Sequence, residues 1–273
     1  MQHSSKQKNY DMRITHFKSV FFGLAILQSS WIVAGSNWLV KEYGHYTLMY
    51  TNADQPNLAN YNKLVTNGIN AVERFFNSPF RKKFAIIIHP GRHSLDSTWQ
   101  TDWKMPEFKS ECWMVASGIA GKLDMISPVL WEKEACEHNY SDTTNTQQLI
   151  SHELVHVYHG QSNKSPDFSN VEGIDWFVEG LATFASGQCD SKRIAMVKAT
   201  VNAGNVPKSL DNFWIGKLKY GLSGSMVMFI ENKYGKPRLT ELLPLTKKSE
   251  MLSSLQITEP GLLKEWEKYI LSL

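Results

Sequence analysis

Two histidines that lie four residues apart, His152 and His156, belong to a segment that the sequence predicts to be a helix. Thr143 and Thr144 are available as helix N-caps, and Gly160 is placed where a glycine commonly ends a helix. Residues at this spacing share one helical face, with Cβ atoms about 5 to 6 Å apart. The fold must therefore contain an intact helix from which two imidazoles project side by side.

This segment reads His152-Glu153-Leu154-Val155-His156, which is an HExxH arrangement. Two imidazoles at this spacing can bind one tetrahedral Zn2+, and Glu153 then projects beside the metal. A catalytic zinc ion needs three protein ligands and an open position for water. We therefore expect a third ligand further along the chain.

Glu179 is the best candidate for the third ligand. It lies in a second expected helix, from Trp176 to Ser186, for which Asp175 is a plausible N-cap and Gly187 follows the end. Two imidazoles and one carboxylate suit zinc. The alternative is a solvated helix glutamate without a metal.

The two motifs together resemble a known family. Twenty-two residues separate His156 from Glu179, which lies in the sequence WFVEGLA. HExxH followed by W-x-x-E-G-x-A resembles the gluzincin metallopeptidases, particularly the peptidase-MA-like group related to membrane aminopeptidases. The resemblance implies that His152, His156 and Glu179 bind one zinc ion and that Glu153 is the general base. It also implies a zincin-like fold, with a twisted N-terminal sheet, a mainly helical C-terminal subdomain and the active-site helix between them.

The resemblance extends more weakly to both sides of these motifs. ASGIAGKLDMISP is similar to the family's edge strand, and YGLSGSMVMFIENKYG resembles its tyrosine-centred helix. The second match implies that Tyr220 donates a hydrogen bond to the oxyanion of the tetrahedral intermediate, although a buried structural tyrosine is an open alternative. Related aminopeptidases carry a glutamate in the edge strand, but no acidic residue lies between Cys112 and Lys122. An endopeptidase is therefore the favoured activity.

Other polar residues near the motifs are weaker candidates. The metzincin pattern HExxHxxGxxH is absent, because the glycine is Gly160, one place late, and Ser162 stands where the last histidine would be. We therefore expect His159 to be a structural residue or a neighbour of the ligands. Asp175 and Thr183 could orient the ligand imidazoles, but helix capping and packing explain them equally well.

The order of the predicted elements gives the fold class. Strands are expected at HYTLMYT and FAIIIHP, and a helix is expected from Leu58 to Phe76. CWMVASGIAGKLDMISP is predicted to be a hairpin or a kinked edge strand. Helices then follow from Asp142 onward and over Asp190 to Val201, Tyr220 to Tyr234 and Leu262 to Leu271. Strands first and helices afterwards indicate an α+β fold.

The first 35 residues differ from the rest of the chain. Basic residues lead into the apolar run VFFGLAILQSSWIVAG, which is short for a membrane span and ends in small residues. We expect a signal peptide at 1–35, cleaved after Gly35, and hence an exported protein that is periplasmic or secreted; a retained membrane anchor is the alternative. The remaining chain should form a sheet-containing subdomain at 36–161, including the HExxH helix, and a helical subdomain at 162–273.

Removal of residues 1–35 would change the formal charge from +3 to 0. A neutral chain without basic clusters gives no electrostatic footprint for nucleic acid.

Cys112 and Cys136 could form a disulfide in an exported protein and leave Cys189 unpaired, or all three could be free thiols. The leading hypothesis is a zinc metalloendopeptidase that acts on a peptide or protein substrate. A noncatalytic zinc-stabilised protein that binds peptide or cell-wall fragments, and a zinc hydrolase of a nonpeptide substrate, are the alternatives.

Overall fold

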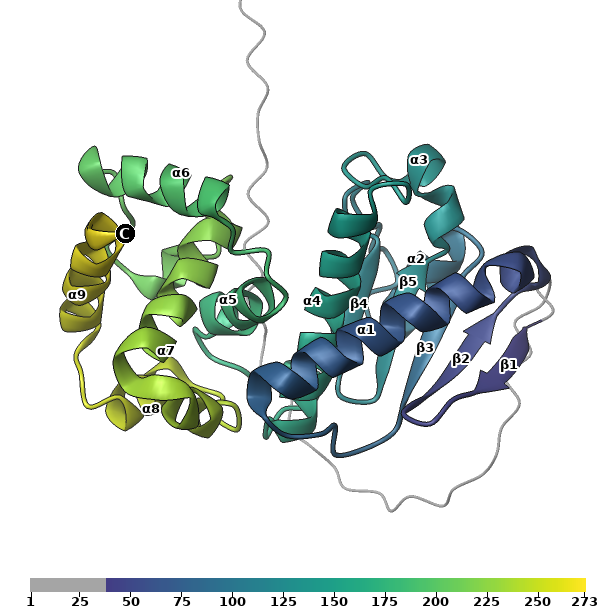
Figure 1. Ribbon diagram of the computed structural model, residues 1–273, viewed down its shortest axis with the longest axis horizontal. Helices are drawn as coiled ribbons and strands as arrows, with labels where there is room; N and C mark the ends of the chain where they lie inside the picture. Colours follow the sequence, from purple (N-terminus) through teal and green to yellow (C-terminus); the bar gives the residue numbers. More distant parts are fainter. Residues whose placement is uncertain (1–37) are drawn as a thin grey trace, which may run out of the picture. The chain divides into compact units, whose positions relative to one another are not determined.

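A computed structural model describes residues 38–273, so the predicted signal or anchor at 1–35 lies outside the described residues. Residues 38–273 belong to one compact unit that joins a mixed five-stranded sheet to a larger set of helices, which confirms the α+β class (Figure 1). The predicted boundary between the two subdomains, at residues 161 and 162, lies inside this unit, and the division into subdomains stays a prediction. Among the described helices, none combines the length and the apolar character that a membrane span requires.

The sheet has the spatial order β1-β2-β3-β5-β4. The three central strands β2, β3 and β5 are parallel, and β1 and β4 pair antiparallel at the two edges. β4 and β5 form the hairpin predicted around Gly118 and Gly121. The strands are Leu39–Glu42 (β1), Tyr46–Tyr50 (β2), Phe84–His89 (β3), Ala116–Ile119 (β4) and Lys122–Ile126 (β5).

Helices lie on both faces of the sheet (Figure 1). α1 (Leu58–Phe76) and α4 (Thr143–Ser162) pack together on one face, and α2 (Arg92–Asp102) lies on the other. Side chains alternate along a strand, so Ile86 and Ile88 of β3 are buried in the apolar core while His89 contacts Ser94 of α2. Three short helical segments complete this half: Asn52–Asn57 (η1), Pro128–Leu130 (η2) and Trp131–Glu134 (α3).

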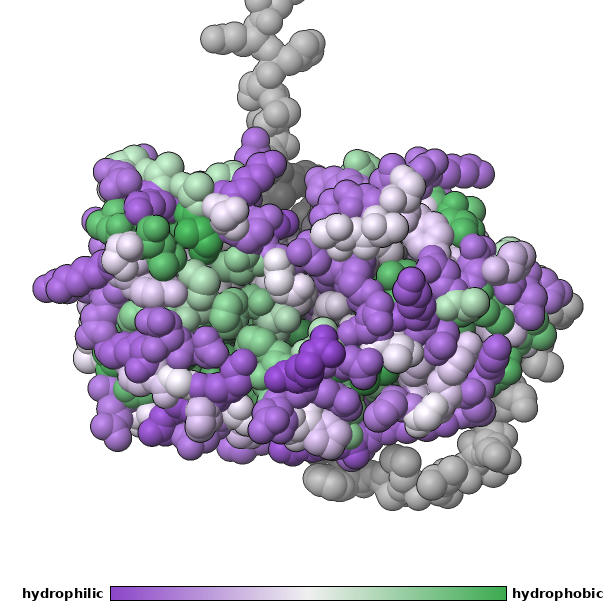
Figure 2. All heavy atoms as spheres, in the orientation of Figure 1, coloured by the Kyte–Doolittle hydropathy of each residue, from purple (hydrophilic) through white to green (hydrophobic). Residues whose placement is uncertain are grey.

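The half of the chain after α4 is helical, and α5 packs against both α4 and α7. Gly235 has φ 80° and interrupts α7 just after Tyr234, where the sequence predicted the helix to end. The helices are Asp175–Ala185 (α5), Ser191–Asn202 (α6), Leu210–Asn212 (η3), Lys219–Leu242 (α7), Lys248–Ser254 (α8) and Glu259–Ser272 (α9). Polar residues cover most of the face shown in Figure 2.

Several helix ends differ from the predictions. The N-cap of α4 is Asp142, whose carboxylate accepts the backbone N–H of Asn145, rather than Thr143 or Thr144. Gly160 does not end α4: a Cβ there would lie 2.7 Å from Ala120 N, so the glycine permits close contact with the β4–β5 turn. Asp175 is the first residue of α5 and not its cap.

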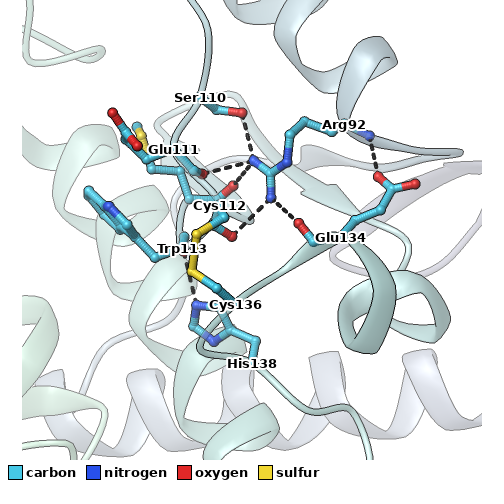
Figure 3. Close-up of a disulfide and its surroundings, with 9 residues drawn as sticks. Arg92, Ser110, Glu111, Cys112, Trp113, Glu134, Cys136 and His138 are labelled. Carbon is cyan, nitrogen blue, oxygen red and sulfur yellow. Dashed lines mark hydrogen bonds between the residues drawn. A yellow bond between two sulfur atoms is a disulfide. The ribbon is translucent and has the colours of Figure 1, made fainter.

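The loop before β4 is held in place by Arg92 and a disulfide (Figure 3). Cys112 and Cys136 are bonded, and Cys189 is a free thiol. The Arg92 guanidinium donates to the carbonyl oxygens of Glu111, Cys112, Met114 and Glu134 and to the Ser110 hydroxyl. This network fixes the chain that leads into the edge strand.

Candidate metal centre

The structure brings His152, His156 and Glu179 together. The first two residues lie one turn apart on α4, and Glu179 comes from α5, which packs against α4. His152 Nε2 is 3.1 Å from His156 Nε2. Glu179 Oε2 is 3.4 Å from the first of these nitrogens and 3.6 Å from the second. Among the described residues, this group of three could hold a metal ion.

The separations between these atoms fit a small tetrahedral ion. Metal–ligand bonds of about 2.0 to 2.1 Å at tetrahedral angles place neighbouring ligand atoms about 3.3 to 3.4 Å apart. The three observed separations lie on both sides of this value. The three atoms therefore already lie close to the positions that one ion would require.

Gln188 orients one of the imidazoles. Its Oε1 lies 2.9 Å from His152 Nδ1, so this ring nitrogen carries the proton and donates it to the amide oxygen. Nε2 of His152 then faces Glu179 and His156. The loop that carries Gln188 is itself fixed, because Arg193 Nη1 donates to the Gln188 carbonyl at 2.8 Å and Gln148 Nε2 donates to the Gly187 carbonyl at 3.0 Å.

The neighbouring imidazoles favour an ionised Glu179 carboxylate. Burial opposes ionisation of Glu179, but His156 and His152 outweigh it and hold the pKa of the carboxyl well below its usual range. Burial likewise opposes protonation of His156, yet the Glu179 carboxylate raises the pKa of this imidazole. The ionised Glu179 carboxylate stabilises positive charge beside it, so the site is suited to a cation.

Glu153 lies next to this centre. Its backbone is held by β4, because Gly118 lies so close that a Cβ at this position would be 2.2 Å from the Glu153 carbonyl oxygen. Among the described residues, no side chain forms a hydrogen bond or ion pair with the Glu153 carboxylate. No described side chain therefore competes with a ligand for this carboxylate.

Tyr220 lies at the first turn of α7, with its ring centroid 6.3 Å from that of His152. Burial and the nearby carboxylates of Glu179 and Glu153 raise the pKa of the phenol. The hydroxyl stays protonated at neutral pH and can donate a hydrogen bond. The neighbouring Lys219 ammonium lies 4.5 Å from the ring centroids of both Trp113 and Trp214.

His159 is not part of the metal-binding group. It is fully buried, and its Nε2 donates to the Leu243 carbonyl at 3.1 Å, which joins the end of α4 to the chain after α7. Burial lowers the pKa of this imidazole to about 3. Thr183 is also fully buried and makes no hydrogen bond to His152 or His156 within the described residues.

Gln188 has no recognisable motif in the sequence, which offers Asp175 and Thr183 instead as candidates to orient the imidazoles. Gln188 follows the glycine after α5, in a short polar loop with no helical or strand pattern. Its proximity to His152 depends on how this loop packs against α4, which the sequence does not show.

Comparisons with known proteins add no identification. No family model matches the chain, and a search of curated proteins gives no match.

Proposed function

We propose that this protein is a zinc-dependent hydrolase, and specifically a zincin-like metalloendopeptidase of gluzincin type. The observation that carries the proposal is the arrangement of His152, His156 and Glu179 at separations suited to a tetrahedral ion, with Glu153 beside them. Zinc bound there would polarise a substrate carbonyl and lower the pKa of water toward about 7.

In this proposal Glu153 accepts the proton of the attacking water and later donates it to the leaving amine. The Tyr220 phenol, which stays protonated, donates a hydrogen bond to the oxyanion. Gln188 holds the His152 ring so that Nε2 faces the centre. Each of these groups acts from a helix or from a loop anchored to a helix.

The edge strand β4 supports the choice of a peptide substrate. It is the last strand of the sheet, and Gly118 brings it against the Glu153 turn of α4. An extended peptide that paired with β4 would bind through backbone hydrogen bonds, which tolerate many side chains. The scissile bond would then lie close to Glu153.

The Cys112–Cys136 disulfide supports the proposal of an exported protein, because structural disulfides form and persist in oxidising compartments. We therefore propose that the protein acts outside the cytoplasm, either released or tethered through the N-terminal segment.

The proposal is tested by incubating the zinc-loaded protein and its Glu153→Gln variant with a complex peptide mixture and identifying new termini by mass spectrometry. Internal cleavages with the unmodified protein alone would support an endopeptidase, and stepwise trimming from one end would support an exopeptidase. Identical mixtures after both incubations would contradict a peptidase and favour a nonpeptide substrate or a binding role.

A further inference from the structure

A cavity of about 400 Å³ has Tyr220 in its wall, and the ring centroid of Tyr220 lies 6.3 Å from that of His152 in the candidate metal centre. Three elements contribute to it: Asn145 from the first turn of α4, the start of α6, and the chain that enters α7. The cavity is open to solvent, and most of the residues that line it are polar. The residues around it are Asn145, Asp190, Lys192, Arg193, Met196, Lys217, Leu218, Tyr220 and Gly221.

Basic side chains predominate among the charged residues that line the cavity. Lys192, Arg193 and Lys217 outnumber the one acidic residue, Asp190, which lies 3.6 Å from Arg193. The first turn of α7, which also borders the cavity, has no acidic residue and no side-chain cap. Because residues 36–273 are formally neutral, this excess of basic residues is a local feature.

The cavity is within reach of a substrate at the metal centre. Asn145 precedes His152 by seven residues on α4, which corresponds to about 10 Å along the helix axis. An extended peptide covers this distance with about three residues, at about 3.3 Å each. The cavity and the centre are also joined by Arg193, whose guanidinium holds the Gln188 carbonyl.

We propose that this cavity binds a carboxylate of the substrate, so that the enzyme prefers anionic peptides with the negative charge about three residues from the scissile bond. The inference rests on the proposed peptidase function and adds the class of substrate. The carboxylate belongs either to an acidic side chain or to the C-terminus of the peptide.

The test measures binding without turnover, using the zinc-loaded Glu153→Gln protein and fluorescence anisotropy at low ionic strength. Three labelled peptides of one length are compared: one with glutamates and an amidated C-terminus, one with glutamines and a free C-terminal carboxylate, and one with glutamines and an amidated C-terminus. We expect one of the first two to bind about fivefold more tightly than the third, and the preference to weaken as salt is added.

Variants of the basic residues assign the preference to the cavity. Adding Lys192→Gln and Lys217→Gln together should remove it, whereas Lys208→Gln, which removes an exposed lysine outside the cavity, should leave it unchanged. Arg193 is kept because it supports Gln188. A preference for the glutamate peptide identifies the ligand as a side-chain carboxylate, and one for the free C-terminus identifies the chain end.

Equal binding of all three peptides, binding of none, or a preference that survives in the double lysine variant would overturn the inference. A parallel digestion of neutral peptides by the unmodified protein tests the function separately. Cleavage without any anionic preference would overturn the inference alone. Anionic preference without cleavage of any peptide would retain the carboxylate site and contradict the peptidase.

Discussion

Replacing Gln188 by leucine removes the acceptor that holds the His152 ring. In the metal-bound state His152 Nδ1 must carry the proton, and leucine would leave this N–H without its partner at 2.9 Å. The metal-free protein avoids this cost, because the ring can move its proton to Nε2 and share it with His156 Nε2, 3.1 Å away. We therefore expect the substitution to weaken metal binding more than it destabilises the metal-free protein.

The expected loss is about 10- to 100-fold in zinc affinity, since an unpaired buried donor costs about 1 to 3 kcal/mol. Zinc affinity is measured by competition with a chromophoric chelator. Gln188→Glu should retain zinc at least as well as the unmodified protein, because a carboxylate accepts the same bond. The control is Gln148→Leu, which removes a bond to the same loop without touching His152. Unchanged zinc affinity in Gln188→Leu would refute the orienting role.

Three further results are expected. Because burial lowers the pKa of His159 to about 3, the unfolded state binds a proton at this imidazole before the folded state does as the pH falls. Between pH 7 and 5, the free energy of unfolding of His159→Gln should therefore decrease by about 2 kcal/mol less than that of the unmodified protein. Urea unfolding without metal measures both decreases, and equal decreases would contradict this. Gly118→Ala should lower both melting temperature and turnover, because its Cβ would displace the Glu153 carbonyl oxygen; full activity would show that this contact is not needed. Replacing Cys112 and Cys136 by serine should reduce the free energy of unfolding by about 3 kcal/mol, given a sequence separation of 24 residues, and a reductant should then have no further effect on the melting temperature.

The predicted helices and strands agree with the structure where the sequence pattern is local. The sequence predicted α1 from Leu58 to Phe76 because its apolar residues follow a helical period, and the structure confirms these bounds. FAIIIH is a buried strand for a similar reason, since a short apolar run is stopped by Pro90 and Gly91. The α+β class followed from the order of such elements.

The predictions fail where packing overrides local preference. Gly160 would end an isolated helix, but here it lies inside α4 and permits contact with Ala120. The polar, aromatic-containing stretch around His93 shows no clear pattern in the sequence. It forms α2, in which Leu95 and Trp99 lie one turn apart and are buried against the rest of the molecule.

The candidate site shows the same division. The sequence could predict that His152 and His156 share a face, because helix geometry fixes this spacing. Helix geometry does not predict that Glu179 faces them, because this depends on how α5 packs against α4. The motif resemblance predicts Glu179 as the third ligand, and the structure brings the three residues together. Gln188 and the basic cavity come from loops and helix starts that meet only in the folded chain.

The central claim is that His152, His156 and Glu179 bind one zinc ion, and metal analysis of the purified protein tests it most directly. Inductively coupled plasma mass spectrometry should find one zinc per chain after exhaustive dialysis, and His156→Ala and Glu179→Ala should each lose the metal. His159→Gln serves as the control and should keep it, because this residue lies outside the group. An unmodified protein without zinc affinity, or variants that keep a full equivalent, would contradict the account.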